Sequence, residues 1–302
     1  MRVRVPASSA NLGPGYDSFG LALALHNEFE AELGDAWRVE VGGEGAGTLS
    51  TGADNPVARA MARLFAETGR PHLAADIACH NGIPVGRGLG SSSAAIVGGL
   101  VLADALIDAR LGADRLLALA AELEGHADNV AAALHGGFTV TASGPSGLVC
   151  APIGPAGGLA AILALGESPL STPDSREALP DSVPHADAAA NIGHATLLAL
   201  GIALGEPRYV QAGLHDAIHE RYRAGLIPDL EPVRALFAAE GVGPAVLSGS
   251  GPTMVVLVPD VDDAHALERA RRLADEVRPM LAGIGRSRVI GVGIDRLGAV
   301  VL

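Results

Sequence analysis

Alternating hydrophobic and polar positions predict several strands in the first part of the chain. Residues 2–6, RVRVP, alternate, and the runs at 19–33, 37–41 and 73–80 have the apolar and β-branched residues typical of strands. Residues 55–69 instead repeat their apolar positions with helical spacing. Asn55 precedes this repeat as the expected N-cap, and Gly69 follows its last turn.

The same patterns alternate between helix and strand along the rest of the chain. They predict helices at about 91–109, 114–124 and 128–134, a strand at 136–143, a strand at 159–166, a helical region at about 186–201, two further helices up to Phe237, a strand–turn–strand at 245–258, a helix at 262–277 and a last strand at 288–294. Glycine and proline are dense between residues 143 and 158, where we place a domain boundary. The predicted fold class is α+β.

Charge and composition exclude several classes of protein. The 302 residues carry a net charge of −13 without a basic run, so we expect no nucleic-acid partner and no binding to an anionic membrane. There is no signal-peptide pattern and no uninterrupted apolar stretch of about 20 residues, so we expect a cytoplasmic protein. Both cysteines, Cys79 and Cys150, lie in apolar strand-like segments and are expected to be small buried hydrophobes.

All 21 basic residues are arginine, and the chain has no lysine. Every mechanism that requires a lysine is therefore excluded. These include the Walker A phosphate loop, the lysine of protein kinases, the Schiff base and the pyridoxal-phosphate anchor.

A glycine-rich loop, PVGRGLGSSSA at residues 84–94, precedes an apolar helical run. Gly86, Gly88 and Gly90 alternate, which frees the backbone for positive φ and lets amide groups approach a ligand. We expect Ser91 or Ser92 to cap the helix, whose N-terminal amides and dipole would attract phosphate. Serine hydroxyls could bind phosphate or Mg²⁺. From the loop alone, an ordinary serine-capped turn explains the pattern equally well.

Two further glycine–serine turns accompany this loop: PASSANLGPGYDSFGLAL at 6–23 and VLSGSGPTM at 246–254. The three together resemble the motifs of the GHMP kinases, which bind ATP without a Walker A lysine. Within that family, the N-terminal motif, EGHADNVAAALHGGF (124–138), STPDSREALP (171–180) and ERYRAGLIP (220–228) are most similar to the homoserine kinase branch. The resemblance covers about residues 3–258.

The resemblance implies a GHMP kinase fold, a two-domain α/β sandwich. An N-terminal ATP-binding domain would span residues 1–155, and a ferredoxin-like C-terminal domain would span residues 156–302. It also implies a homodimer. The loop would hold the phosphates of ATP through Pro84, Val85, Gly86, Arg87, Gly88, Leu89, Gly90, Ser91, Ser92, Ser93 and Ala94, with Asn55 bordering the adenine.

For the reaction itself, the resemblance places Mg²⁺ on Ser92 and Glu124, with Glu122 as the competing carboxylate. Ser92, Glu124, Asn129 and Thr172 would be catalytic. No general base is assigned, because Asn129 stands where other GHMP kinases have an aspartate, and phosphoryl transfer depends mainly on positioning and charge neutralisation.

The implied substrate, L-homoserine, needs partners for an ammonium, a carboxylate and a hydroxyl. Asp17 would bind the ammonium, and Arg176 and Arg223 would clamp the carboxylate bidentately, with Arg221 as the nearby alternative. The full predicted substrate set is Asn11, Asp17, His126, Arg176, Arg223, Gly249 and Ser250. The paired arginines favour a zwitterionic amino acid over mevalonate or a sugar, and the intact loop favours a kinase over a catalytically silent ligand-binding protein.

The chain departs from the usual family pattern at three places. Arg87 stands where small or polar residues are frequent, and three serines replace the usual two, so that Ser91, Ser92 and Ser93 are all possible metal contacts. Pro56 replaces an apolar residue beside the expected adenine site. The adenine contacts are therefore the least defined part of the predicted site.

Overall fold

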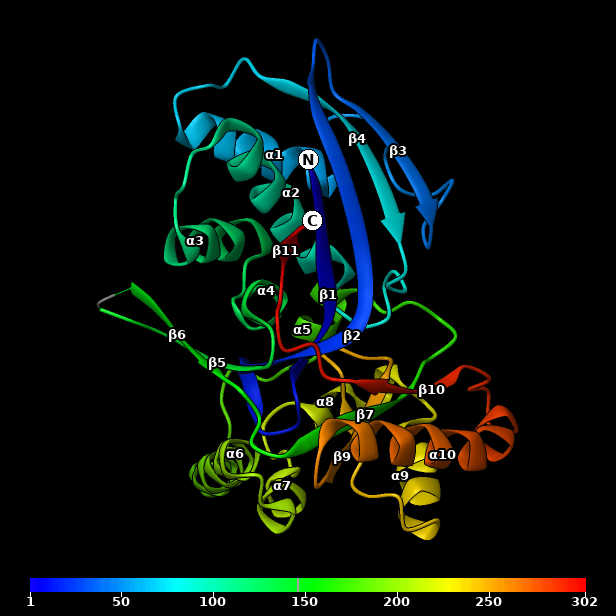
Figure 1. The fold of residues 1–302 in the computed structure, drawn as a ribbon. Coiled ribbons are helices and arrows are strands. Elements are labelled where there is room, and N and C mark those ends of the chain that lie inside the picture. Colours follow the sequence, from blue (N-terminus) through cyan, green and yellow to red (C-terminus); the bar gives the residue numbers. More distant parts are fainter. Residues whose placement is uncertain (146) are drawn as a thin grey trace.

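A computed structural model describes residues 1–145 and 147–302, without the side chain of Thr172. Its strands form two separate sheets, which lie in the upper and lower halves of the molecule in Figure 1. The two chain ends lie close together beside the first sheet (Figure 1). The helices pack on both sheets, and the α+β class is confirmed.

The first sheet has the strand order β11-β1-β2-β4-β3, and a β5–β6 hairpin extends from β2. Its strands in chain order are β1 (Arg2–Asn11), β2 (Gly15–Gly34), β3 (Arg38–Gly43), β4 (Ala74–Asn81), β5 (Phe138–Gly144), β6 (Gly147–Ile153) and β11 (Val300–Val301). Pairing is antiparallel throughout, except that β3 runs parallel to β4. The long β2 therefore connects the sheet core with the hairpin.

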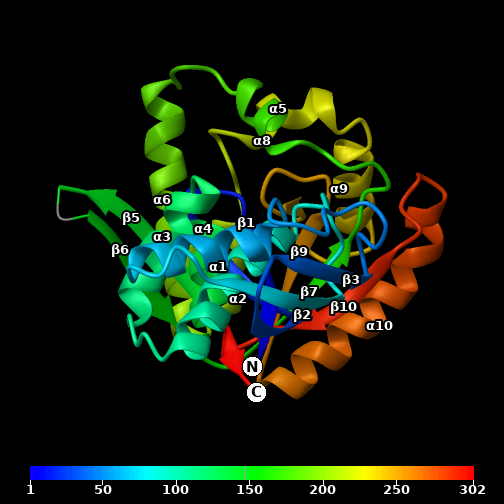
Figure 2. The same ribbon diagram turned by 90° about the horizontal axis from the view of Figure 1, so that it is seen from above.

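Four helices cover this sheet: α1 (Pro56–Glu67), α2 (Ser91–Ile107), α3 (Ala113–Glu124) and α4 (Asp128–His135). Figure 2 shows α1 and α2 lying across the strands. Two glycines in α2 permit this close packing. A Cβ on Gly98 would lie 2.4 Å from the Phe29 ring, and one on Gly99 would lie 2.4 Å from the Val57 carbonyl oxygen. The helix that follows the glycine-rich loop is thereby fixed against the core.

The second sheet has the order β10-β7-β9-β8, formed by β7 (Gly158–Ala164), β8 (Val246–Leu247), β9 (Met254–Asp260) and β10 (Val289–Gly293). Strand β7 is buried at every residue. The helices of this half are α5 (Thr172–Glu177), α6 (His185–Leu204), α7 (Pro207–Gly213), α8 (Glu220–Arg223), α9 (Leu230–Ala239) and α10 (Asp263–Ala282), and a 3₁₀ turn spans Ala224–Leu226. Helix α10 lies along the outer side of β10 (Figure 2).

The glycine- and proline-rich stretch contains the strand β6, paired with β5, in which Cys150 lies. Two local predictions were wrong. Strand β10 is not the last, because β11 follows it and pairs with β1. Three helices rather than two lie between α6 and β8. Of the cysteines, Cys79 is buried as expected, but Cys150 is only partly buried.

Helix α6 is long and apolar, although the sequence was not expected to contain an uninterrupted apolar stretch of about 20 residues. Among the described residues it is the one helix long and apolar enough to cross a membrane by length and composition, and 22% of its apolar window is buried. The buried Asn191 amide nevertheless ties it to the rest of the fold, since it donates to the Pro14 carbonyl at 2.7 Å and accepts from the Ala217 amide at 3.2 Å. This helix therefore helps to hold the N-terminal turn. The division at residue 155, which falls between β6 and β7, stays a prediction.

Candidate active site

The three glycine–serine turns, far apart in sequence, meet between the two sheets. Asn11 and Ser248 form an isolated antiparallel bridge, and the Gly249 amide donates to the Ala10 carbonyl at 2.9 Å. The Ser248 hydroxyl lies 2.6 Å from the Gly88 carbonyl oxygen, and the Ser8 amide donates to the Leu89 carbonyl at 3.1 Å. The N-terminal and C-terminal turns thus hold the glycine-rich loop between them.

The glycines of the central loop are required by this packing. Gly88 and Gly90 both have positive φ, at +72° and +67°. A Cβ on Gly88 would lie 2.2 Å from the Ser248 carbonyl oxygen, and one on Gly90 would lie 2.1 Å from the Ser8 hydroxyl. The loop can therefore lie against its neighbours only without side chains at these positions.

A cavity of about 220 Å³ opens where the turns meet. Most of the predicted site residues line it: Asn11, Asp17, Asn55, Val85, Gly86, Arg87, Gly88, Leu89, Gly90, Ser91, Ser92, Glu124, His126, Asn129, Arg176, Arg223, Gly249 and Ser250. The structure does not place Pro84, Ser93 or Ala94 on the cavity wall. The predicted catalytic Thr172 begins α5, but its side chain lies outside the described part of the structure.

Beside the N-terminus of α2, two hydroxyls and one carboxylate come together. Ser92 donates to one Glu124 carboxylate oxygen at 2.9 Å, and Ser93 donates to the other at 2.7 Å. The competing Glu122 instead pairs with Arg63 at the surface. A carboxylate with adjacent hydroxyls is the hard oxygen set that suits Mg²⁺, which takes one or two carboxylates plus phosphates and water. The residues present therefore fit the predicted magnesium site, with both Ser92 and Ser93 at the carboxylate.

The start of α2 differs from the expected serine cap. Gly90 is the N-cap, in the left-handed conformation, and it provides no side-chain hydrogen bond to the helix. The helix is 17 residues long and has no acidic residue within its own first turn, so the Glu124 carboxylate, bound to the Ser92 and Ser93 hydroxyls, is the negative group at its positive end. Arg87 donates to the Glu167 carbonyl at 2.7 Å. The loop therefore offers an anion its backbone amides, and the Arg87 guanidinium on the cavity wall adds a positive charge.

At the opposite side of the cavity, Asp17 and Arg176 form a bidentate ion pair. The two Arg176 nitrogens lie 2.7 and 2.9 Å from the Asp17 oxygens, and both side chains are more than a third exposed. Asp17 has a left-handed φ of 52°, and its backbone amide donates to the Asn11 side chain at 3.0 Å. The Tyr16 hydroxyl also accepts from Arg176, at 2.9 Å. A carboxylate and a guanidinium, both accessible to a ligand, thus lie side by side.

Arg223 approaches the same region from α8 and is almost fully buried. Its Nε atom donates to the Ser175 carbonyl at 3.3 Å, and its Nη1 atom contacts His219 Nδ1 at 2.9 Å and the Gly249 carbonyl at 3.3 Å. Burial lowers the pKa of this guanidinium, although Tyr16 beneath it opposes the shift. Arg223 lines the cavity, and among the described residues its Nη2 atom has no hydrogen-bond partner.

His126 and Asn129 are held by neighbours that the sequence did not single out. His126 Nδ1 lies 2.7 Å from the Asp128 carboxylate, and Asn129 Oδ1 accepts from the Ser8 hydroxyl at 2.9 Å. Burial opposes protonation of His126, but the hydrogen bond and charge of Asp128, with the charge of Glu124, outweigh it and raise the pKa of the imidazole. His126 is thus a polar wall residue with one nitrogen already engaged.

The remaining wall of the cavity is largely apolar, with Asn27 and Asn81 as polar members. Its wall includes Phe29, Leu49, Pro56, Val57, Cys79 and Val85. Burial raises the pKa of the Cys79 thiol to about 12, so this sulfur stays a neutral wall atom. Asn55 borders this end, but its side chain caps α1 through the Val57 amide at 2.9 Å and donates to the Ser50 carbonyl at 2.8 Å. The apolar wall suits the face of a flat ring such as a nucleobase.

Several residues of the site were missed by sequence reasoning. Tyr16, Ser8 and Asp128 lie inside the motifs quoted above but were not assigned a role. His219 stands four residues before Arg223, a spacing that places both on one face of a helical turn and could have indicated their contact. No local signal predicts the approach of Arg176 to Asp17, which are 159 residues apart.

Comparisons with known proteins agree with this architecture. The family model of the GHMP kinases N terminal domain matches residues 55–137, and that of the GHMP kinases C terminal domain matches residues 196–275. The homoserine kinase of Moorella thermoacetica is 39% identical over 89% of this chain and 93% of its own length. That of Streptomyces coelicolor is 39% identical over 100% of this chain and 94% of its own.

A solved structure shows the same fold over the full length. The homoserine kinase of Cytophaga hutchinsonii superposes with a TM-score of 0.87 at 26% identity, covering 100% of this chain and 97% of that one. Family models thus match both halves, and relatives of about 40% identity match nearly the whole chain. The expected GHMP kinase fold is confirmed. The chain belongs to the GHMP kinase family, within its homoserine kinase branch.

Proposed function

We propose that this protein is an ATP-dependent homoserine kinase, which transfers the γ-phosphoryl group of ATP to the hydroxyl of L-homoserine and yields O-phospho-L-homoserine for threonine biosynthesis. One observation carries the proposal: a single cavity joins the glycine-rich loop and the N-terminus of α2 to the accessible Asp17–Arg176 ion pair. The first suits phosphate, and the second suits a zwitterion.

The phosphates bind at the glycine-rich loop and the first amides of α2, with the nucleobase against the apolar wall. Ser92 and Glu124 would hold Mg²⁺, with the buried Ser93 bound to the second oxygen of Glu124, and the ion would neutralise phosphate charge during transfer. Since the chain has no lysine, the loop contributes positive charge through backbone amides and the helix dipole. These dipoles are fixed before the reaction, so no reorganisation is needed as charge develops.

Homoserine binds by exchanging partners with the Asp17–Arg176 pair. Its ammonium takes the place of the guanidinium at Asp17, and its carboxylate bridges Arg176 and the cavity-facing edge of Arg223. A zwitterion replaces the charges that the two side chains lose, whereas mevalonate or a sugar leaves Asp17 without a cationic partner. Asn11, His126, Gly249 and Ser250 complete the wall around the ligand.

The hydroxyl attacks the γ-phosphorus in line, and its proton leaves to a phosphate oxygen or to water. His126 is not assigned as the base, because a histidine bonded to a neighbouring aspartate is common as a structural support and phosphoryl transfer needs no strong base. Asn129 cannot accept a proton usefully, and Ser8 fixes its side-chain oxygen. Positioning and charge neutralisation therefore supply the rate enhancement. A position for Thr172 near the reacting hydroxyl stays a prediction.

A coupled ADP-release assay tests the function. The protein is supplied with ATP, Mg²⁺ and, in separate reactions, L-homoserine, mevalonate or galactose, and the product is identified by phosphorus NMR. We expect turnover with L-homoserine. Turnover with mevalonate or galactose alone would refute the substrate, and binding of ATP without turnover of any acceptor would favour the silent-protein alternative. The same assay without Mg²⁺ tests the metal.

The two domains, 1–155 and 156–302, the homodimer and the cytoplasmic location belong to this proposal. The relatives' similarity over both halves of the chain supports the two-domain organisation. Sedimentation velocity at micromolar protein would test the dimer.

A further inference from the structure

His219 is a fully buried imidazole with both ring nitrogens engaged. It lies at the N-cap of α8, and its Nε2 atom is 2.7 Å from the Gly13 carbonyl oxygen. Its Nδ1 atom is 2.9 Å from Nη1 of Arg223, one helical turn later. The same ring therefore touches the N-terminal turn and one of the two arginines of the proposed carboxylate clamp.

The two contacts define a single tautomer. A guanidinium nitrogen can only donate and a carbonyl oxygen can only accept, so Nδ1 must be the unprotonated acceptor and Nε2–H the donor. Burial lowers the pKa of His219 to about 4, and the positive charge of Arg223 acts in the same direction against the opposing charge of Asp216. The imidazole is thus neutral at physiological pH, as an acceptor for Arg223 requires.

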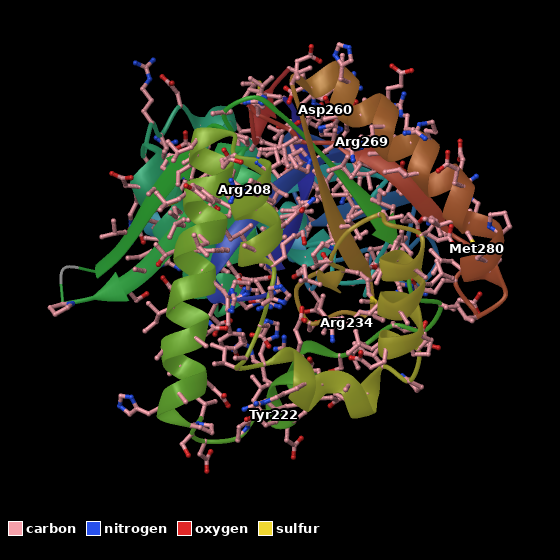
Figure 3. The ribbon with its side chains drawn as sticks, turned by 90° about the horizontal axis from the view of Figure 1, so that it is seen from below. Arg208, Tyr222, Arg234, Asp260, Arg269 and Met280 are labelled. Carbon is pink, nitrogen blue, oxygen red and sulfur yellow. The ribbon has the colours of Figure 1, made fainter. Side chains whose placement is uncertain are left out.

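The surroundings keep this ring in place. Asp216 accepts hydrogen bonds from the amides of His219 and Glu220 at 2.9 and 2.7 Å, which fixes the turn. The buried Glu220 accepts from the Leu247 amide at 2.6 Å and pairs with Arg234 of α9, which is labelled in Figure 3. The Tyr16 ring packs against the imidazole with 5.3 Å between centroids. These contacts fix the position from which His219 Nδ1 accepts the hydrogen bond of Arg223.

We propose that His219 is a positioning residue for substrate recognition: by accepting from Nη1, it turns the Nη2 edge of Arg223 toward the carboxylate of the amino-acid substrate. The hydrogen bond from His219 Nε2 to the Gly13 carbonyl fixes the Nη2 edge of Arg223 relative to the turn that carries Asp17. The inference rests on the proposed function, and it assigns to His219 an effect on carboxylate binding and not on ATP binding.

Two substitutions separate the two bonds. In His219→Asn, the side-chain oxygen takes the place of Nδ1 and can still accept from Arg223. In His219→Gln, the amide nitrogen takes the place of Nε2 and can still donate to Gly13, while the acceptor for Arg223 is lost. His219→Gln should raise the KM for homoserine about 10- to 100-fold, the range for one hydrogen bond to a charged group, and His219→Asn should raise it much less. The KM for ATP should stay within about 2-fold in both, as in the distant control His194→Gln.

A substrate without the carboxylate provides the decisive comparison. For 3-aminopropan-1-ol, His219→Gln should change kcat/KM little, so the preference for homoserine should fall about 10- to 100-fold. If this amine is not turned over, inhibition constants of L-2-aminobutyrate and 1-aminopropane against homoserine give the same ratio. An equal loss for both ligands, or an equal effect of the Asn and Gln variants, would reduce His219 to a structural residue and overturn the inference.

The wild-type protein provides two independent checks. If it does not phosphorylate homoserine, the proposed function itself fails, whatever the variants do. Nitrogen-15 NMR of labelled histidine in the intact protein should show one neutral imidazole with Nε2–H that persists below pH 6, and this needs no folded variant. A His219 that is protonated at Nδ1 at neutral pH would also overturn the inference.

Discussion

Replacing Gly90 by alanine tests how far the phosphate loop depends on its close packing. Gly90 has a φ of +67° and caps α2. An added Cβ would lie 2.1 Å from the Ser8 hydroxyl and 3.2 Å from the Ser8 carbonyl oxygen. Because Ser8 is fully buried, its hydroxyl can avoid the methyl group only by giving up its 2.9 Å bond to Asn129.

The structure sets the size of the effect. Left-handed backbone costs alanine about 1–2 kcal/mol. A buried hydrogen-bonding group left without its partner costs a further ~1–3 kcal/mol. Alanine also restricts the unfolded chain, which returns about 0.4–1 kcal/mol. Gly90→Ala should therefore lower the free energy of unfolding by about 1–5 kcal/mol.

Urea unfolding, followed by circular dichroism, measures this loss, with Gly69→Ala as the matched control. Gly69 has a similar φ of +71°, but nothing lies within 4 Å of its Cβ position, so only the backbone strain remains. Gly90→Ala should also raise the KM for ATP, because Asn129 and the first amides of α2 move together, whereas Gly69→Ala should not. Equal destabilisation by both substitutions would refute the role assigned to the Ser8 contact.

Three further predictions concern charge. Glu124→Gln should lower kcat about 100-fold and raise the Mg²⁺ concentration needed for half-maximal activity. Glu122→Gln, at a surface ion pair, should do neither, and equal effects of the two substitutions would show that Glu124 does not bind the metal. Asp17→Asn should raise the KM for homoserine at least 10-fold, and an unchanged KM would exclude an ammonium contact. The free energy of unfolding should change by only about 0–1 kcal/mol, because both side chains of the Asp17–Arg176 pair are more than a third exposed. His219 has a pKa of about 4 in the folded protein against an ordinary 6.5, so its contribution to the free energy of unfolding is complete above pH 6.5 and falls by about 3 kcal/mol as the pH decreases toward 4. Urea midpoints measured across this range should therefore fall more steeply with decreasing pH in the wild type than in His219→Asn. The same dependence on pH in both proteins would contradict this.

Local signals in the sequence were sufficient for most of the fold. The Asn55 cap and the spacing of α1 were predicted correctly, because a side chain two residues from its partner needs no tertiary context. The cap of α2 was wrong for a physical reason. The sequence favours serine as the cap, but the crowding of Ser8 and Asn129 requires a residue without a Cβ, and Gly90 takes that position. Strand β6 was not among the predicted elements, although the segment around Cys150 was expected to be strand-like, because the glycines and prolines around it resemble a linker.

The candidate site, like the fold, could be predicted only in part from the sequence. The resemblance of the motifs identified Asp17, Arg176, Arg223 and the loop, and the structure brings them to one cavity. The resemblance could not indicate how these groups contact one another. Asp17 pairs with Arg176 across 159 residues of sequence, and His219 contacts Gly13 across 206. The contact of His219 with Arg223 is local in sequence, but it depends on the packing around the imidazole ring.

The pairing of β11 with β1 has a consequence for the order of folding. Val3 lies opposite Val301, and Arg4 lies opposite Val300, so one edge of the first strand remains without its partner until the chain beyond β10 has been made. During synthesis, the first half can form its core around β2 and α2 early, but it keeps an open strand edge throughout the synthesis of the second half. The β1–β11 pair joins two strands that are far apart in sequence, and contacts of such long sequence separation slow folding.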